Sequence, residues 1–294
     1  MKEFWQVDAF TTEPFCGNPA VLVFDTDDMN VEWMQAVSRE MNLSETAFFS
    51  LPTKSGADYR VRFFTQRREV PFCGHATIAA AHAFIERYCA AARRVIHQEC
   101  EAGIIPIQVR TEGGTRVYVM RQSSPKYRNL TKPADYYAGL LGCTRDELEP
   151  GPVQVVSTGV PWMIIWLGNE QALEGLEPNF SEIEQECRRE QATGVTVFAL
   201  SRSESPWIVK LRTFAPGEGV LEDPVCGSGN GSVGAYLANN IFPDKVEFQY
   251  QAFQGQKVNR PGQILVRCVR ADDGELQVHV GGPAIKTLEG KVLP

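Results

Sequence analysis

The sequence lacks the features of three large classes of protein. Its first residues, MKEFWQVDAFTTEPF, have no apolar stretch after the charged start and so do not resemble a secretory signal peptide. No uninterrupted apolar run approaches the ~20 residues of a membrane-spanning helix. Basic clusters are missing as well, because the net charge is −7 and the Arg-containing runs at 66–68 and 93–94 are short. We therefore expect a cytoplasmic protein with no nucleic-acid partner and no membrane partner, since both partners need concentrated Lys and Arg.

Closely spaced cysteine pairs are also absent. None of the eight cysteines lies in a C-x-x-C motif, which argues against a zinc knuckle and against a thioredoxin-type site. A chain of this size without a secretion signal more often keeps its thiols reduced than paired in disulfides. We therefore expect no metal site and small buried thiols at most of these positions. Cys73 and Cys226 differ from the others because both lie in a repeated motif.

Two segments of the chain repeat one pattern. Residues 61–85 read VRFFTQRREVPFCGHATIAAAHAFI, and residues 210–238 read KLRTFAPGEGVLEDPVCGSGNGSVGAYLA. Each contains Arg-x-Phe on a strand-like segment, then a charged loop, Pro-x-Cys-Gly and a run of small residues that predicts a buried helix. Because the two copies lie about half of the 294-residue chain apart, we infer two homologous halves, in a chain long enough for two domains.

We expect an α+β fold, because many strands accompany a single central helix in each half and no βαβ alternation is visible. The halves are predicted to span 1–124 and 125–294, with the polar stretch 121–137 as the linker and the last strand free to pack back on the first half. Helices are predicted at 31–41, about 75–88 and about 228–240. Strands are predicted at 4–10, 20–24, 46–51, 59–64, 95–99, 104–109, 117–120, 153–157, 162–166, 195–199, 208–214, 248–252, 263–269 and 276–280.

Both repeats place Cys-Gly at the start of a helix. The first turn of a helix has backbone N–H groups without a helical acceptor and carries about half a positive charge. A glycine there lets an anion approach the backbone closely. If the halves pack about a pseudo-twofold axis, the two helix starts can face each other across a cleft. We expect such a cleft to bind a small carboxylate-bearing metabolite and to stabilise negative charge at the neighbouring carbon.

Four motifs make the chain resemble a known family. FCGNPA at 15–20, LSETAF at 43–48, FFTQRREVPFCGHAT at 63–77 and EDPVCGSGNG at 222–231 are similar to the motifs of PhzF-like proteins, a family named for a phenazine-biosynthesis isomerase. The resemblance spans most of the chain. It implies the diaminopimelate-epimerase-like fold, in which two similar halves each wrap mostly antiparallel strands around a central helix. It also implies a homodimer and a cofactor-independent isomerase, like the family member that shifts a proton on a dihydro-hydroxyanthranilate.

The resemblance further implies roles for individual residues. Glu45 in LSET corresponds to the family's acid/base, and a carboxylate whose pKa is raised by burial can act as both base and acid. His75 corresponds to the site histidine, which is favoured as a neutral ring because an imidazolium in the first turn would oppose the helix dipole. Asp223 corresponds to an aspartate that would orient a polar group of the substrate. The implied substrate-binding residues are Gly74, Gly227 and the hydroxyl of Ser228.

Each of these residues also has an ordinary structural interpretation. Glu45 could be a solvated loop acid, and His75 could bond only to the backbone. Asp223 could be a turn residue, and Ser228 a simple helix cap. The remaining histidines match no family motif and are expected to be structural; they are His82, His97 and His279.

Cys226 departs from the family pattern, which in many members reads DPVTGS where this chain reads DPVCGS. Both halves therefore carry cysteine at the position that two-thiol racemases and epimerases of this fold use. A helix N-terminus is expected to lower the pKa of such a thiol. Two mechanisms are open: Glu45 shuttles a proton on one face, which the retained LSET, GHAT and EDP motifs favour, or Cys73 and Cys226 form a two-base pair. A non-catalytic protein that binds a small carboxylate on the same scaffold is a third possibility, and the two thiols could simply be buried residues of the cleft.

Overall fold

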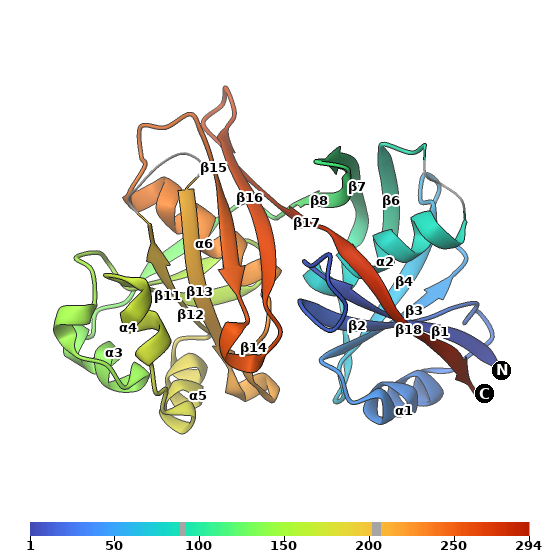
Figure 1. The fold of residues 1–294 in the computed structure, drawn as a ribbon, viewed down its shortest axis with the longest axis horizontal. Helices are drawn as coiled ribbons and strands as arrows, with labels where there is room; N and C mark the ends of the chain where they lie inside the picture. Colours follow the sequence, from blue (N-terminus) through green and yellow to red (C-terminus); the bar gives the residue numbers. More distant parts are fainter. Residues whose placement is uncertain (89–91, 202–206, 294) are drawn as a thin grey trace. The chain divides into compact units, whose positions relative to one another are not determined.

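The chain folds into two units (Figure 1). Unit 1 comprises Met1–Met120 and Gly281–Pro294, and unit 2 comprises Arg121–Val280. The computed structural model describes residues 1–88, 92–201 and 207–293. Among these residues no helix is long and apolar enough to cross a membrane. The seven cysteines of the described ranges are free thiols, and the eighth, Cys89, lies outside those ranges.

Unit 1 is a curved sheet with one helix packed in its interior. Its strands are β1 (Lys2–Ala9), β2 (Asn18–Val23), β3 (Glu45–Ser50), β4 (Tyr59–Phe64), β5 (Glu69–Val70), β6 (Val95–Cys100), β7 (Gly103–Glu112), β8 (Thr115–Arg121) and β18 (Ala284–Val292). The hydrogen-bonded order is β18–β1–β2–β3–β4–β6–β7–β8, and the short β5 pairs with the end of β4. Only the pairs β2/β3 and β4/β6 are parallel. The last strand thus pairs with the first strand of the chain.

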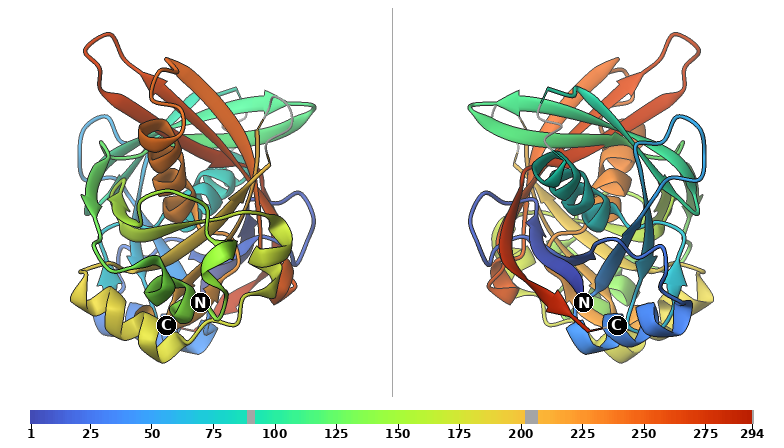
Figure 2. Two further views of the ribbon diagram at one scale, coloured as in Figure 1. Left: turned by 90° about the vertical axis from the view of Figure 1, so that its left-hand side faces the viewer. Right: turned by 90° about the vertical axis from the view of Figure 1, so that its right-hand side faces the viewer.

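The interior helix of unit 1 is α2 (Gly74–Arg87), which contacts β1, β2, β3, β4, β6 and β18. Figure 2 shows this helix, coloured teal, among the strands of its own unit. Its alanine-rich sequence explains the position, because Ala79, Ala80 and Ala81 are fully buried and let the strands approach the helix backbone. Helix α1 (Val31–Met41) packs outside the sheet through its apolar stripe, which includes Met34 and Val37.

Unit 2 repeats this plan. Its strands are β9 (Lys126–Asn129), β10 (Gln154–Ser157), β11 (Pro161–Leu167), β12 (Gly194–Leu200), β13 (Trp207–Ala215), β14 (Val220–Asp223), β15 (Glu247–Gln254), β16 (Gly262–Arg270) and β17 (Leu276–Gly282). The hydrogen-bonded order is β9–β10–β11–β12–β13–β15–β16, and the short β14 pairs with the end of β13. The pairs β11/β12 and β13/β15 are parallel. The interior helix α6 (Gly227–Asn240) contacts β10, β11, β12 and β16. The pairing of β9 to β16 in unit 2 therefore matches that of β18 and β1 to β7 in unit 1, as the predicted two similar halves require.

The three helices expected from the sequence are present at Val31–Met41, Gly74–Arg87 and Gly227–Asn240. Unit 2 has three further helices that the sequence pattern did not predict. They are α3 (Ala134–Leu141), α4 (Glu170–Gly175) and α5 (Phe180–Arg189). Residues 121–137 are not a bare linker, because they form β9 and the start of α3 within unit 2. Two of the missed helices do begin with a local signal, since the side chains of Asn169 and Asn179 accept hydrogen bonds from the first turns of α4 and α5.

His82 gives unit 1 a predicted sensitivity to acid. The ring is partly buried in α2, and its Nδ1 lies 3.3 Å from the hydroxyl of Tyr118. Burial lowers the pKa of His82 from 6.5 to about 4. In the unfolded chain His82 has its ordinary pKa, so the unfolded chain binds a proton first as the pH falls. The contribution to stability is therefore fully present above pH 6.5 and is lost as the pH falls towards about 4. We expect the free energy of unfolding to drop by about 1–3 kcal/mol across this window.

Urea unfolding at pH 7 and pH 4.5 tests this prediction. The His82→Gln variant should lose part of the acid sensitivity of the wild type, because it removes the group that titrates. His97→Gln is the matched control, since the side chain of His97 is 42% exposed in the same unit. An unchanged pH dependence in His82→Gln would contradict the prediction.

Candidate active site

The structure brings three of the candidate residues of unit 1 together. Glu45 is the first residue of β3, Cys73 precedes the first turn of α2, and His75 lies in that turn. The Nε2 atom of His75 is 3.3 Å from Oε2 of Glu45, and its Nδ1 atom is 3.5 Å from Sγ of Cys73. Cys73 and His75 are buried, and the side chain of Glu45 is 19% exposed. Glu45 is therefore not a solvated loop acid, and His75 does not bond only to the backbone.

This cluster of thiol, imidazole and carboxylate suits proton transfer. A neutral imidazole has one N–H donor and one acceptor nitrogen. Sγ of Cys73 is the hydrogen-bonding neighbour of Nδ1. Oε2 of Glu45 lies 3.3 Å from Nε2 but accepts no hydrogen bond from the described residues. The hydroxyl of Ser44, 3.5 Å from Nε2, lies beside the same contact.

The same three groups also have the spacing of a metal site, because their ligand atoms lie within 4.8 Å of one another. In the structure, the imidazole turns a different nitrogen to each of the other two groups. A metal ion bound by one nitrogen would break one of these two contacts. The three side chains therefore form a compact cluster held by their own contacts.

In unit 2 the candidate residues surround the start of α6. Asp223 ends β14, and its Oδ1 accepts a hydrogen bond from the backbone of Val225. Cys226 caps the helix: its Sγ accepts from the N–H of Gly229 at 3.3 Å. Ser228 lies in the first turn and accepts a hydrogen bond from the indole of Trp162, between Nε1 and Oγ, at 2.9 Å. The sequence did not reveal the part played by Trp162.

The thiol of Cys226 differs from the sequence expectation. Burial raises its pKa well above the ordinary value of 9.0, and the nearby negative charge of Asp223 acts in the same direction. The hydrogen bonds from Ser228 and Gly229 act in the opposite direction but are the weaker effects. The expected lowering of the pKa at a helix N-terminus is therefore wrong for this cysteine, because desolvation of the thiolate outweighs the helix. Cys226 is a protonated thiol at neutral pH.

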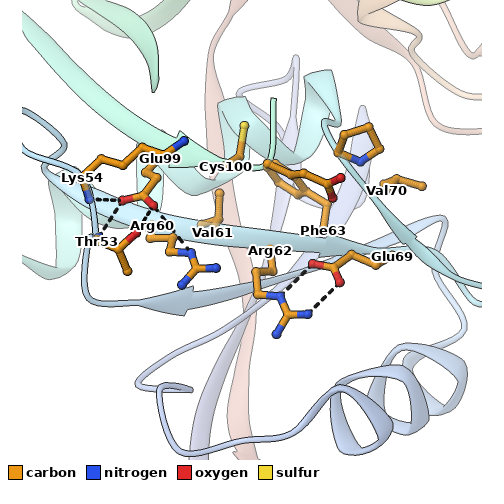
Figure 3. A pocket seen from close by; sticks show the side chains of 12 residues that line it. Thr53, Lys54, Arg60, Val61, Arg62, Phe63, Glu69, Val70, Glu99 and Cys100 are labelled. Carbon is orange, nitrogen blue, oxygen red and sulfur yellow. Dashed lines mark hydrogen bonds and ion pairs between the residues drawn. The ribbon is translucent and has the colours of Figure 1, made fainter. Parts of the chain in front are cut away.

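A matching ion pair ties the strand before each helix start to the sheet. In unit 1 the guanidinium of Arg62 donates to both carboxylate oxygens of Glu69, at 2.7 and 2.6 Å, as Figure 3 shows. In unit 2 Arg212 donates in the same way to Glu222, at 3.0 and 2.8 Å. Each guanidinium also lies over the phenylalanine of its own Arg-x-Phe motif. The repeated Arg-x-Phe therefore anchors β5 and β14, the short strands that lead into the two interior helices.

These ion pairs should differ in their contribution to stability. The side chains of Arg212 and Glu222 are 11% and 10% exposed, against 24% and 28% for Arg62 and Glu69. We expect Glu222→Gln to lower the free energy of unfolding by ~2 kcal/mol and Glu69→Gln by ~1 kcal/mol. The loss is larger for Glu222→Gln because Arg212 is less hydrated than Arg62, so water replaces less of the lost interaction. Urea unfolding measures both changes.

Glu247→Gln is the control for an exposed pair, since Arg267 and Glu247 are 40% and 48% exposed. We expect it to change stability by less than ~0.5 kcal/mol. Equal losses for Glu69→Gln and Glu222→Gln would contradict the dependence on burial.

A separate pocket of about 310 Å³ opens on unit 1 beside β4 and β6 (Figure 3). Neither Glu45 nor Cys73 nor His75 lines it. Its charged lining residues are balanced in sign and are Lys54, Arg60, Arg62, Glu69, Glu99 and Glu101. Several of these charges already have partners within the pocket, since Arg62 binds Glu69 and Glu99 accepts from the backbone of the loop above it. The pocket thus offers no unbalanced charge to a ligand.

Comparisons with known proteins show what this chain is similar to. A family model described as "Phenazine biosynthesis-like protein" matches residues 7–290. An uncharacterized isomerase of Clostridium acetobutylicum is 35% identical and aligns over 98% of this chain and 97% of its own length. The trans-2,3-dihydro-3-hydroxyanthranilate isomerase of Pseudomonas aeruginosa is 30% identical over 99% of both chains.

Solved structures give the same result. The crystal structure of a PhzF-family phenazine biosynthesis protein of Bacillus anthracis matches with a TM-score of 0.91 and 29% identity, over 100% of this chain and 99% of the other. A hydroxyproline epimerase from Agrobacterium vitis matches with a TM-score of 0.64 over 99% and 90% of the two chains, but at 11% identity it shows the fold alone. The predicted diaminopimelate-epimerase-like fold is confirmed.

Proposed function

This chain belongs to the family of phenazine biosynthesis-like proteins and is an isomerase, and we propose that it moves a proton from one carbon of a small carboxylate-bearing metabolite to another without a cofactor. The contact between Glu45 and Nε2 of His75, at 3.3 Å, is the observation that carries this proposal. It places a partly buried carboxylate beside an imidazole in unit 1, with its buried Oε2 not engaged in a hydrogen bond to any described residue.

Glu45 would act first as a base and then as an acid. Its carboxylate takes a proton from a substrate carbon, and the electron pair left behind moves into the adjoining conjugated system. The protonated Glu45 then returns the proton to a different carbon, so nothing is oxidised or reduced. His75 would hold the carboxylate by its N–H in the first step. A general base and acid of this kind contributes roughly 10²- to 10⁴-fold to a rate.

A pair of thiols is the weaker alternative. Two-base epimerisation needs one of the two thiols as a thiolate, because the thiolate is the reactive form of cysteine. Burial keeps Cys226 protonated, so Cys226 could only deliver a proton and Cys73 would have to remove one. Cys73 faces the imidazole of His75 at 3.5 Å, close to Glu45. The retained LSET, GHAT and EDP motifs favour the carboxylate as the base.

The substrate would be held by its carboxylate. We propose that the backbone N–H of Gly227 and the hydroxyl of Ser228 bind this group, and that Asp223 orients a second polar group. The first turn of a helix favours an anion through its dipole. A substrate-binding role for Gly74 stays a prediction. A homodimer and a cytoplasmic location stay predictions.

Solvent deuterium tests the proposed reaction. The enzyme is incubated in D2O with trans-2,3-dihydro-3-hydroxyanthranilate, the compound in the name of the Pseudomonas aeruginosa relative, and deuterium entry at carbon is followed by NMR. Product formation that depends on Glu45 and persists in Cys226→Ser supports the proposal. Exchange that depends on Cys226 and not on Glu45 supports a two-thiol epimerase. Binding of carboxylates without exchange in any of them supports a binding protein.

A further inference from the structure

The registers of the strands place Glu45 and Gly194 at equivalent positions of the two units. Phe64 and Phe214, the phenylalanines of the repeated Arg-x-Phe motif, pair with the second residues of β3 and β12. Those strands begin with Glu45 and Gly194. The acid of unit 1 therefore has a residue without a side chain as its counterpart in unit 2.

The neighbouring strands extend this equivalence to Trp162. Across the parallel pairs, Glu45 lies beside Ala20 and Gly194 lies beside Trp162. A Gly-x-Pro sequence directly precedes both neighbours, in GNPA and GVPW. This second repeated motif supports the register independently. In unit 1 the small Ala20 thus lies beside the large Glu45. In unit 2 the large Trp162 lies beside Gly194, which has no side chain.

The exchange changes the group that contacts the start of the interior helix. In unit 1 the carboxylate of Glu45 contacts His75, the second residue of α2. In unit 2 the indole of Trp162 contacts Ser228, the second residue of α6, at 2.9 Å. Gly194 makes room for the indole, because a Cβ atom there would lie 2.7 Å from the ring of Trp162. Equivalent places in the two units therefore hold a carboxylate–imidazole contact and an indole–hydroxyl contact.

We propose that Trp162 is a positioning residue that makes Ser228 a hydrogen-bond donor to the substrate carboxylate; this proposal rests on the proposed function. The indole N–H can only donate, so the oxygen of Ser228 accepts in this contact. The hydroxyl hydrogen of Ser228 must then turn elsewhere. Its other side-chain neighbour is the sulfur of Cys226 at 3.6 Å, which is a weak acceptor. An ionised carboxylate is a much stronger acceptor for the same hydrogen.

Burial keeps this arrangement in place. Trp162 is 4% exposed and lies in β11, with β10 and β12 paired on its two sides. The large ring therefore has little freedom to rotate away from Ser228. A serine whose hydrogen is turned towards the ligand favours an ionised acceptor, such as a carboxylate, over a neutral acceptor, such as the oxygen of a carboxamide. Trp162 thereby determines specificity without touching the substrate.

Binding of two small probes tests the inference without any turnover. Anthranilate carries a carboxylate, and 2-aminobenzamide carries a carboxamide of similar shape. We expect wild-type protein to bind anthranilate more tightly, and Trp162→Phe to reduce the ratio of the two dissociation constants by ~3- to 10-fold, the size of one ordinary hydrogen bond. Trp166→Phe is the matched control, because Trp166 is on the same strand, stacks on Phe198 and should leave the ratio unchanged.

The double variant separates positioning from a merely structural role. Ser228→Ala should lower the ratio, and adding Trp162→Phe to it should lower the ratio no further. A further drop in the double variant, an unchanged ratio in Trp162→Phe, or no binding of anthranilate by wild-type protein would each overturn the proposal. Selective binding of anthranilate without any proton exchange would contradict only the proposed isomerase reaction and would leave the proposed role of Trp162 in place.

A readout that needs no ligand tests the contact itself. The indole N–H resonance of Trp162 is identified in an ¹⁵N-tryptophan spectrum by its loss in Trp162→Phe. In Ser228→Ala this resonance should move and exchange faster with water, since its acceptor is gone. A resonance that does not respond to Ser228→Ala would overturn the proposed role of Trp162.

Discussion

Glu45→Gln should slow deuterium entry into the substrate by ~10³-fold, because the amide cannot accept a proton from carbon. Glutamine has nearly the same shape and can keep the contact with Nε2 of His75, so the start of β3 should keep its structure. The loss should therefore appear in kcat and leave the dissociation constant for anthranilate within a few-fold of the wild type. Proton exchange measured by NMR in D2O and calorimetric titration separate these two effects.

Two variants accompany this experiment. Glu40→Gln changes a glutamate on the exposed face of α1 and should leave the exchange rate unaltered. Cys226→Ser should keep the rate within ~10-fold of the wild type, because a buried, protonated thiol is not the base that removes the proton. A Glu45→Gln variant that retains a tenth or more of the wild-type rate would show that another group removes the proton.

The fold was largely predictable because both copies of the repeat carry the residues that build it. Arg-x-Phe supplies the ion pair and ring contact that anchor β5 and β14, and the small residues after Pro-x-Cys-Gly allow α2 and α6 to be buried. Helices α3, α4 and α5 were not predicted. They are short, lie outside the repeated segments and are stabilised by tertiary packing, as for Ile183 and Cys187 of α5 in the core of unit 2.

The candidate site was less predictable, because its chemistry depends on contacts between distant strands. The resemblance supplied Glu45 and His75, but only the pairing of β3 with its neighbours brings the two side chains to 3.3 Å. The pKa of Cys226 was misjudged from the helix alone, since the strands around α6 exclude water from the thiol. Trp162 was overlooked, although the second Gly-x-Pro motif in the sequence marks its position.

The two units show how one architecture supports different chemistry at equivalent places. In unit 1 the carboxylate of Glu45 contacts the imidazole of His75, which suits the proposed proton transfer. In unit 2 the hydroxyl of Ser228 accepts from the indole of Trp162, which suits the proposed binding of a carboxylate. The two differences between the units are thus coupled. In unit 1 Glu45 fills the space at the helix start and its neighbour is the small Ala20, whereas in unit 2 Trp162 fills that space and its neighbour is Gly194.

Gly194→Ala should therefore destabilise unit 2 strongly. A Cβ atom at this position would lie 2.1 Å from the backbone oxygen of Phe214 and 2.7 Å from the ring of Trp162. The oxygen belongs to β13, which is paired along its length with β12, so it cannot shift without breaking the ladder. We expect the free energy of unfolding to fall by ~3 kcal/mol or more, from strain that the surrounding strands cannot relieve.

Gly139→Ala provides the control for this last prediction, since a Cβ atom there meets no other atom within 4 Å and Gly139 lies in helix α3 of the same unit. That variant should be more stable than the wild type by ~0.5–1 kcal/mol, because alanine loses less conformational freedom in a helix than glycine. Urea unfolding compares the two variants. The indole resonance of Trp162 should also move in Gly194→Ala, because the displaced ring can no longer reach Ser228 at 2.9 Å. A Gly194→Ala protein with wild-type stability and an unmoved resonance would show that the space beside Trp162 does not require glycine.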